Sequence, residues 1–429
     1  MLSPGAKGWI TKYFDLVERG EIQLVYKRPK SIGKREFMRL TFTGSGLVFG
    51  YPSQLLFARE IDDSNWTQDE KLKLLLFESH LLVYMLADES RIFTKEKFIA
   101  SLFDFYRFHN VRSLIDVFRI FKKENATDVI EGILAKRIDI KLNLVENKWW
   151  VNSLSNAFVY LDVILFNDYA HHKDDDSIIN YNSYAQNVLT AIVLSAYADG
   201  EIQEKEKTIF SVFLASSGLV DERRDKAKEQ LRNGATFEDF SDYVKTHWLL
   251  KHFILDIAAL TIFSGSEMLD EEVSFLGELS DFLECEEAAS QESLVLVENF
   301  VLKTNDKAIF LQNTGAYDKV YRSFTGRWSK VLNRNKDKIA TELKESRHLI
   351  NLIRKSAKEE LSPEEKKEVK DQLKDLARAV PALTLFMLPG GSILMPLLLK
   401  ALPDLVPSAF RENQVDEDQG EERKNPATE

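Results

Sequence analysis

The chain has 429 residues, of which 44% are hydrophobic and 29% charged, a composition that fits an ordinary globular protein and excludes a fibre or a wholly disordered chain. Its formal net charge of −11 argues against DNA as a partner. A single cysteine, Cys285, excludes an internal disulfide and a cysteine-rich metal site, which favours a reducing compartment.

The N-terminal region, residues 1–175, is predicted to be helical and cytoplasmic. Met1–Gly20 includes two acidic side chains and lacks the apolar core that a secretory signal needs. Apolar residues recur at three- and four-residue spacing through most of the chain and strand-like alternation is rare, so we predict an all-α fold. One expected helix face consists of Leu72, Leu75, Leu76, Ser79, Leu82, Val83 and Leu86, and another of Val111, Leu114, Ile115, Phe118 and Phe121.

A polar stretch, Asp168–Asn182, is expected to link this region to a central helical domain over residues 181–303. Within that domain the acidic segment Ala196–Glu206 separates two apolar-periodic runs. Asp199 is expected to end one helix in a tight turn, and Glu206 falls in the first turn of the next, where the helix dipole favours a carboxylate.

The same segment supplies some of the ligands of an EF-hand calcium loop but not all. Asp199, Gly200 and Glu206 occupy positions five, six and twelve of such a loop, whereas Ser195 and Tyr197 stand where carboxylates are needed. We therefore predict a structural turn and no cofactor, with a weak divalent-cation site on Asp199 and Glu206 as the alternative.

The spacing A-D-G-x-I-x-x-x-E in this turn resembles the tellurite-resistance TerB-like domain, over about Tyr181–Cys285. That resemblance implies repeated helical hairpins. A second copy of the turn is expected at Glu267–Glu272, 66 residues after Glu201–Glu206, and a third echo relates Ile92–Phe103 to Ile202–Phe213. On this hypothesis the N-terminal region is a diverged relative of the central domain.

The sequence contains no motif that argues for an enzyme. A G-x-S-x-G elbow, an H-E-x-x-H pair, a Walker loop and a Rossmann fingerprint are all missing from it. With seven histidines and one cysteine, nucleophilic triads have few candidate members. We therefore expect a protein without catalytic activity.

A third domain is predicted over residues 318–411, after a boundary at Thr304–Tyr317. Ser329–Arg378 contains 14 basic and 10 acidic side chains, so it is mildly positive in an acidic chain. Serine at position 362, proline at 363 and glutamate at 365 form the pattern of a capping box. This pattern predicts a helix from Pro363 to about Ala379.

The predicted helix leads into an apolar segment, residues 379–402, that is the chain's candidate membrane element. Ala379–Leu399 holds 21 residues without a charge, and at about 1.5 Å per residue it matches a hydrocarbon core of roughly 30 Å. Pro381, Pro389 and Pro396 break it, so we expect a kinked helix or two half-helices. The alternative is a buried part of a soluble helical domain.

The proline spacing of this segment resembles that of the Letm family of membrane proteins, and the arrangement of domains resembles bacterial Letm-related, biofilm-associated proteins. The resemblance implies membrane association, ribosome binding and a part in cation/proton exchange. It ends near Phe410, and residues 412–429 are expected to form a disordered acidic tail. The positions that carry it are Asp375, Leu376, Arg378, Pro381, Pro389, Pro396, Lys400, Pro403, Pro407, Ser408 and Phe410.

One departure bears on function, because Ser392 stands where that family usually has an acidic residue. An ion path without a carboxylate is disfavoured. We therefore predict a membrane-associated adaptor on the cytoplasmic face of the inner membrane, with membrane lipid and the ribosome as partners. The alternatives are a cation transporter or its regulator, which would need a homo-oligomer to enclose a pathway, and a soluble cytoplasmic stress-response scaffold of TerB type.

Overall fold

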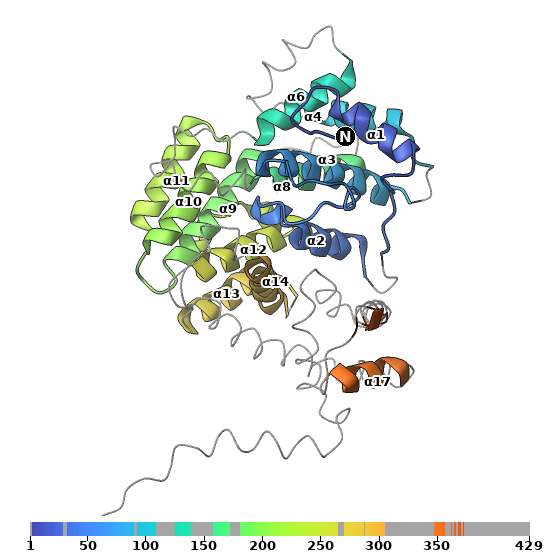
Figure 1. Ribbon diagram of the computed structural model, residues 1–429. Helices are drawn as coiled ribbons and strands as arrows, with labels where there is room; N and C mark the ends of the chain where they lie inside the picture. The colour runs from blue at the N-terminus through green and yellow to red at the C-terminus, as the bar shows by residue number, and fades with distance from the viewer. Residues whose placement is uncertain are drawn as a thin grey trace, which may run out of the picture. The chain divides into compact units, whose positions relative to one another are not determined.

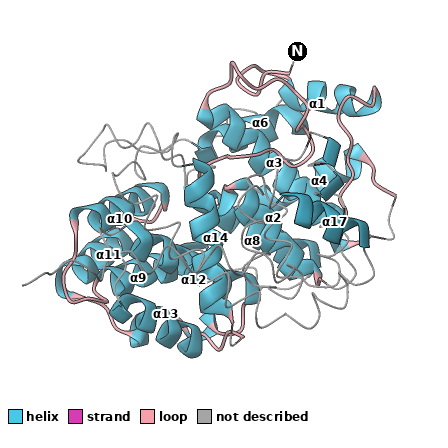
Figure 2. Cartoon of the chain, turned by 60° about the horizontal axis from the view of Figure 1, so that its bottom comes forward, coloured by secondary structure: helices cyan, strands magenta, loops and turns pink. Residues whose placement is uncertain are grey.

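The computed structural model describes residues 2–28, 32–89, 92–108, 125–138, 158–171, 181–264, 270–286, 288–304 and 347–356, and the single positions or pairs 362, 364–365, 368–369 and 372. Every regular element among these residues is a helix, which confirms the predicted all-α fold (Figure 2). The chain divides into two compact units. Unit 1 comprises Met1–Arg28 and Gly33–Val320, and unit 2 comprises Pro29–Ile32 and Tyr321–Glu429.

Unit 1 contains two successive sets of helices (Figure 1). The first set is α1 (Trp9–Glu18), α2 (Lys34–Ser45), the 3-10 turn η1 (Leu47–Phe49), α3 (Gln68–Ala87), α4 (Lys95–Phe108), α6 (Ala126–Ile138) and α8 (Val159–His171). The second set is α9 (Tyr181–Ala196), α10 (Glu204–Ser216), α11 (Asp221–Asn233), η4 (Phe237–Asp239), η5 (Asp242–Val244), α12 (Trp248–Ser264), α13 (Asp270–Phe282) and α14 (Ala289–Thr304). The polar linker is shorter than expected, because α8 continues to His171 and α9 begins at Tyr181.

Helix α3 shows how local sequence and burial together define an element. It begins at a capping box in which the Glu70 amide donates to the Thr67 hydroxyl and the Thr67 amide donates to the Glu70 carboxylate. All seven residues of the predicted face are buried, but Leu74, Phe77 and Leu81 on other sides are buried too. A helix that is apolar on all sides belongs inside a protein, so α3 is a central helix. The second predicted face, at 111–121, lies outside the described residues.

Each set has one helix that packs against several of the others: α3 against α4, α6 and α8, and α9 against α10, α11 and α12. The contacts of the remaining helices differ between the sets, since α4 packs against α6 whereas the packing of α10 is chiefly against α9 and α12. The repeat relationship itself stays a prediction.

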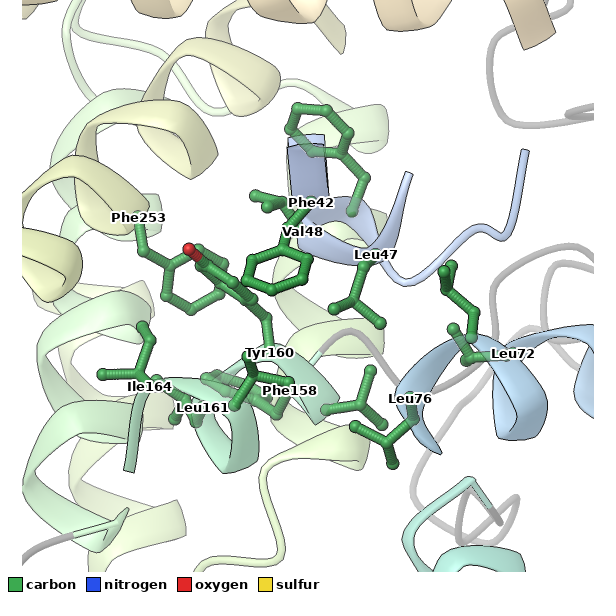
Figure 3. Close-up of a cluster of buried hydrophobic side chains, with 14 of the residues drawn as sticks. Phe42, Leu47, Val48, Leu72, Leu76, Phe158, Tyr160, Leu161, Ile164 and Phe253 are labelled. Atoms are coloured by element: carbon green, nitrogen blue, oxygen red, sulfur yellow. The ribbon is translucent and has the colours of Figure 1, made fainter. Parts of the chain in front are cut away.

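Residues predicted to form the N-terminal region and the central domain share one hydrophobic core. At its centre the ring of Tyr160 in α8 lies 5.8 Å from that of Phe42 in α2 and 5.0 Å from that of Phe253 in α12 (Figure 3). Edge-on ring pairs at this distance add to the stabilisation that burial provides. Helix α2 also packs against α12 and α14, so it reaches across the first set to the second.

Two buried ion pairs lie within this core. Arg39 of α2 donates from Nη2 to Asp256 Oδ1 of α12 at 2.7 Å, and from Nη2 to the Ser293 hydroxyl of α14 at 2.8 Å. Arg137 of α6 makes two 2.7 Å bonds to Asp162 of α8. Burial lowers the pKa of each guanidinium, but the neighbouring groups together outweigh burial and hold the pKa above its usual value. These groups are chiefly Asp256 and Glu292 for Arg39, and Asp162 and Tyr181 for Arg137.

Removing Asp256 takes away the buried carboxylate that matches the charge of Arg39, whose other carboxylate partner, Glu292 at 3.3 Å, has a side chain that is 48% exposed. We expect Asp256→Ala to lower the free energy of unfolding by about 3–5 kcal/mol, because the side chain of Arg39 is only 4% exposed. Urea unfolding followed by circular dichroism measures this. The matched control is Asp225→Ala, which removes a surface partner 4.0 Å from Lys228 and should cost less than about 0.5 kcal/mol. Equal losses of unfolding free energy in the two variants would show that the buried pair contributes no more to stability than the surface pair.

Candidate functional site

The acidic turn between α9 and α10 contains the two residues predicted to bind a cation. Gly200 adopts a left-handed backbone with φ of +91°, and its amide donates to the carbonyl of Tyr197 at 2.9 Å. Asp199 Oδ1 accepts the Glu201 amide at 3.1 Å, and Glu206 Oε2 accepts the Gln203 amide at 2.8 Å. Both carboxylates therefore have backbone donors, and the turn forms as the sequence predicted.

The structure places a third carboxylate, that of Glu272 in α13, near this turn. Glu206 is 1% exposed, and burial raises its pKa to about 7; the nearby charges of Asp199 and Glu272 act in the same direction, and the Gln203 amide opposes them. Glu272 lies in the first turn of α13 and is also 1% exposed. Sequence reasoning did not place it beside Glu206, although the 66-residue register that aligned Glu267–Glu272 with Glu201–Glu206 already paired the two glutamates.

These carboxylates do not form a recognisable metal centre. Within the parts of the chain that the structure describes, no group of three or more histidine, cysteine, aspartate and glutamate side chains is arranged to hold a metal ion. The hydrogen bonds of Asp199 and Glu206 account for the turn without an ion. The weak cation site stays a prediction.

The second candidate site is the C-terminal helix pair, which consists of α17 (Arg347–Ser356) and the helical residues after Ser362. The Glu365 amide donates to Ser362 Oγ at 3.2 Å, and the Ser362 amide donates to Glu365 Oε2 at 2.9 Å. These are the two bonds of the capping box that the sequence predicted. Loss of a serine cap typically costs about 1 kcal/mol.

One ion pair and one histidine–carboxylate contact connect α17 (labelled in Figures 1 and 2) to this second helix. Lys355 Nζ lies 2.7 Å from Glu365 Oε1, and His348 Nε2 lies 2.9 Å from Glu368 Oε1. The hydrogen bond from Lys355 lowers the pKa of the Glu365 carboxyl below its usual value. The apolar side chains of Leu349, Leu352 and Val369 are withdrawn from solvent, at 0%, 5% and 5% exposure.

The predicted membrane or docking residues all lie outside the described residues. Among the helices that the structure describes, none is both long enough and apolar enough to cross a bilayer. The predicted docking residues are Arg378, Pro381, Pro389, Pro396, Lys400, Pro403 and Pro407.

Comparison with known proteins assigns a family resemblance to the C-terminal part of the chain. Residues 361–429 match the family model described as "LETM1-like, RBD", where RBD denotes a ribosome-binding domain. The match begins at the capping box and contains every predicted docking residue, and it continues past Phe410, where the resemblance was expected to end. It supports the Letm resemblance, whereas the TerB-like and biofilm-associated resemblances receive no support. No curated protein and no solved structure matches the chain.

The raised pKa of Glu206 predicts a pH-dependent stability. The folded protein holds this proton more tightly than the unfolded chain, whose value is near 4.5, so the stabilisation is complete below that pH and is lost as the pH rises through about 7. We expect Glu206→Gln, which can still accept the Gln203 amide, to raise the free energy of unfolding by about 1–2 kcal/mol near pH 8 and to change it little near pH 4. Urea titrations with a chelator present measure this.

Glu204→Gln is the matched control, because the Glu204 side chain is 86% exposed in the same helical turn. It should show no change between these two pH values beyond a few tenths of a kcal/mol. A parallel response of both variants would contradict the assignment to Glu206.

Calorimetric titration of the wild-type chain with calcium, magnesium or manganese tests the cation site. Absence of heat would mean that Asp199 and Glu206 serve only the structural turn.

Proposed function

We propose that this chain is a non-enzymatic adaptor whose C-terminal segment binds ribosomes and docks on a membrane. The observation that carries the proposal is the match of residues 361–429 to a LETM1-like ribosome-binding domain. The capping box at Ser362 and the side-chain contacts to α17 give the start of this region a defined local structure.

The charge distribution supports a ribosomal partner for this part of the chain. Ser329–Arg378 is mildly positive although the whole chain carries a net charge of −11. Basic side chains bind phosphates of ribosomal RNA and release counterions, so the affinity should fall as salt is added. Arg378 and Lys400 are basic residues within the family match, one on each side of the uncharged stretch Ala379–Leu399.

The apolar character of residues 379–402 supports the membrane part of the proposal. The segment has the length to reach across a hydrocarbon core, and its prolines make a kinked docking element more favourable than a straight span. Ser392, in place of an acidic residue, favours docking over ion exchange.

Pelleting with purified ribosomes tests the first part. We expect the full-length chain to co-sediment at low salt and to be released at high salt, and Arg378→Glu/Lys400→Glu to weaken binding by about tenfold or more, because each lost phosphate contact reduces the electrostatic part of the affinity. Lys226→Glu/Lys228→Glu in α11 makes the same change in net charge and should bind as the wild type does. A wild-type chain that remains in the supernatant at low salt would refute ribosome binding.

Liposome flotation tests the second part. We expect the full-length chain to float with vesicles that contain anionic lipid, and Leu394→Asp to remain at the bottom of the gradient, because a carboxylate well inside an apolar segment costs up to about 3 kcal/mol. Leu394→Ile keeps the apolar character and serves as the control. If the Asp variant floats as well as the wild type, residues 379–402 are not the docking element.

A further inference from the structure

The family match begins at residue 361, but residues that precede it hold the helix that opens it. Lys355 and His348 lie in α17, outside the match, and their partners Glu365 and Glu368 lie inside it. The two pairs are seven residues apart on α17, which is about two turns. The second helix is therefore fixed to α17 at two separate points.

We propose that α17 belongs to the part of the chain that binds the ribosome. In this proposal Lys355 and His348 are positioning residues, which set the direction of the helix after Ser362. The proposal rests on the ribosome-binding function proposed above. It assigns a role to residues that the family match does not include.

Burial and charge contribute differently to this arrangement. A short helix is marginal in water without tertiary contacts, so the helical residues after Ser362 depend on packing. Leu349, Leu352 and Val369 provide buried apolar surface in the two helices. Polar contacts such as these, with side chains 24–56% exposed, add little stability, but two of them restrict how one helix can rotate against the other.

The sequence predicts that this helix continues to about Ala379, which places Arg378 ten residues after Glu368 on the same helix. On that prediction, the orientation of the helix at Glu365 and Glu368 sets where Arg378 and the start of the apolar segment are presented. These are the residues proposed to bind the ribosome and the membrane. If the helix stayed folded but pointed in another direction, the chain would no longer bind the ribosome.

A charge reversal with rescue separates positioning from direct contact. We expect Lys355→Glu in the full-length chain, which sets two carboxylates against each other, to pellet with ribosomes about fivefold less tightly. Lys355→Glu/Glu365→Gln should restore most of the binding, because the neutral glutamine side chain removes the repulsion and can still accept the Ser362 amide. Lys207→Glu, which faces Glu204 in α10 of unit 1, is the matched reversal and should bind normally.

A second pair of variants tests the buried contact. Leu352→Asp should abolish pelleting, Leu352→Met should retain it, and thermal unfolding of unit 1 should be the same in both. Unchanged binding by Lys355→Glu and Leu352→Asp would overturn the inference while the ribosome-binding function stands. Weak binding that Glu365→Gln does not rescue would overturn it as well, since Lys355 would then contact the ribosome itself. A wild-type chain that does not pellet would refute the proposed function and this inference with it.

Discussion

The Arg39–Asp256 pair is the interaction on which the architecture of unit 1 most depends. Arg39 lies in the second helix of the chain, and its partners are 217 and 254 residues away in α12 and α14. A guanidinium can be buried only where its charge is matched and its N–H groups have hydrogen-bond partners. The pair therefore favours the position of α2 that brings Arg39 to Asp256, and any other position of α2 would cost free energy. The surrounding rings of Phe42, Tyr160 and Phe253 supply the apolar stabilisation that a buried ion pair does not give by itself.

Glutamate side chains that accept backbone amides recur through the chain and explain part of its acidic composition. Glu78 is fully buried and accepts the amides of residues 56, 57 and 58 together with the Tyr13 hydroxyl. Glu131 accepts the amides of Gly8 and Ile10 at the start of α1. Glu70, Glu206 and Glu365 do the same within capping boxes. These carboxylates fix loops and helix starts, because the backbone amides provide the positive ends of dipoles; Glu365 has Lys355 as a further partner.

The features that the sequence predicted correctly are local. The capping box at Ser362 and the turn at Asp199 involve residues within a few positions of each other, so spacing alone determines their bonds. The pairing of Arg39 with Asp256 could not be predicted, since nothing in the spacing of two residues so far apart indicates contact. The approach of Glu272 to Glu206 is an intermediate case, because the repeated register pointed to it but only packing brings the two charges close. Helix α3 was expected to be amphipathic but is buried on all sides, because α4, α6 and α8 pack against it.

The net negative charge of the chain affects how it approaches an anionic partner. Ribosomal RNA and anionic lipid both repel a protein whose net charge is −11, and the repulsion acts over about 10 Å at moderate salt. Only a locally positive region can make the first contact, and Ser329–Arg378 has that character immediately before the apolar segment. Repulsion from the rest of the chain then favours encounters in which this region leads. Under this constraint, a net-negative protein gains selectivity for approach through its locally positive region, while repulsion from its acidic surface slows the association.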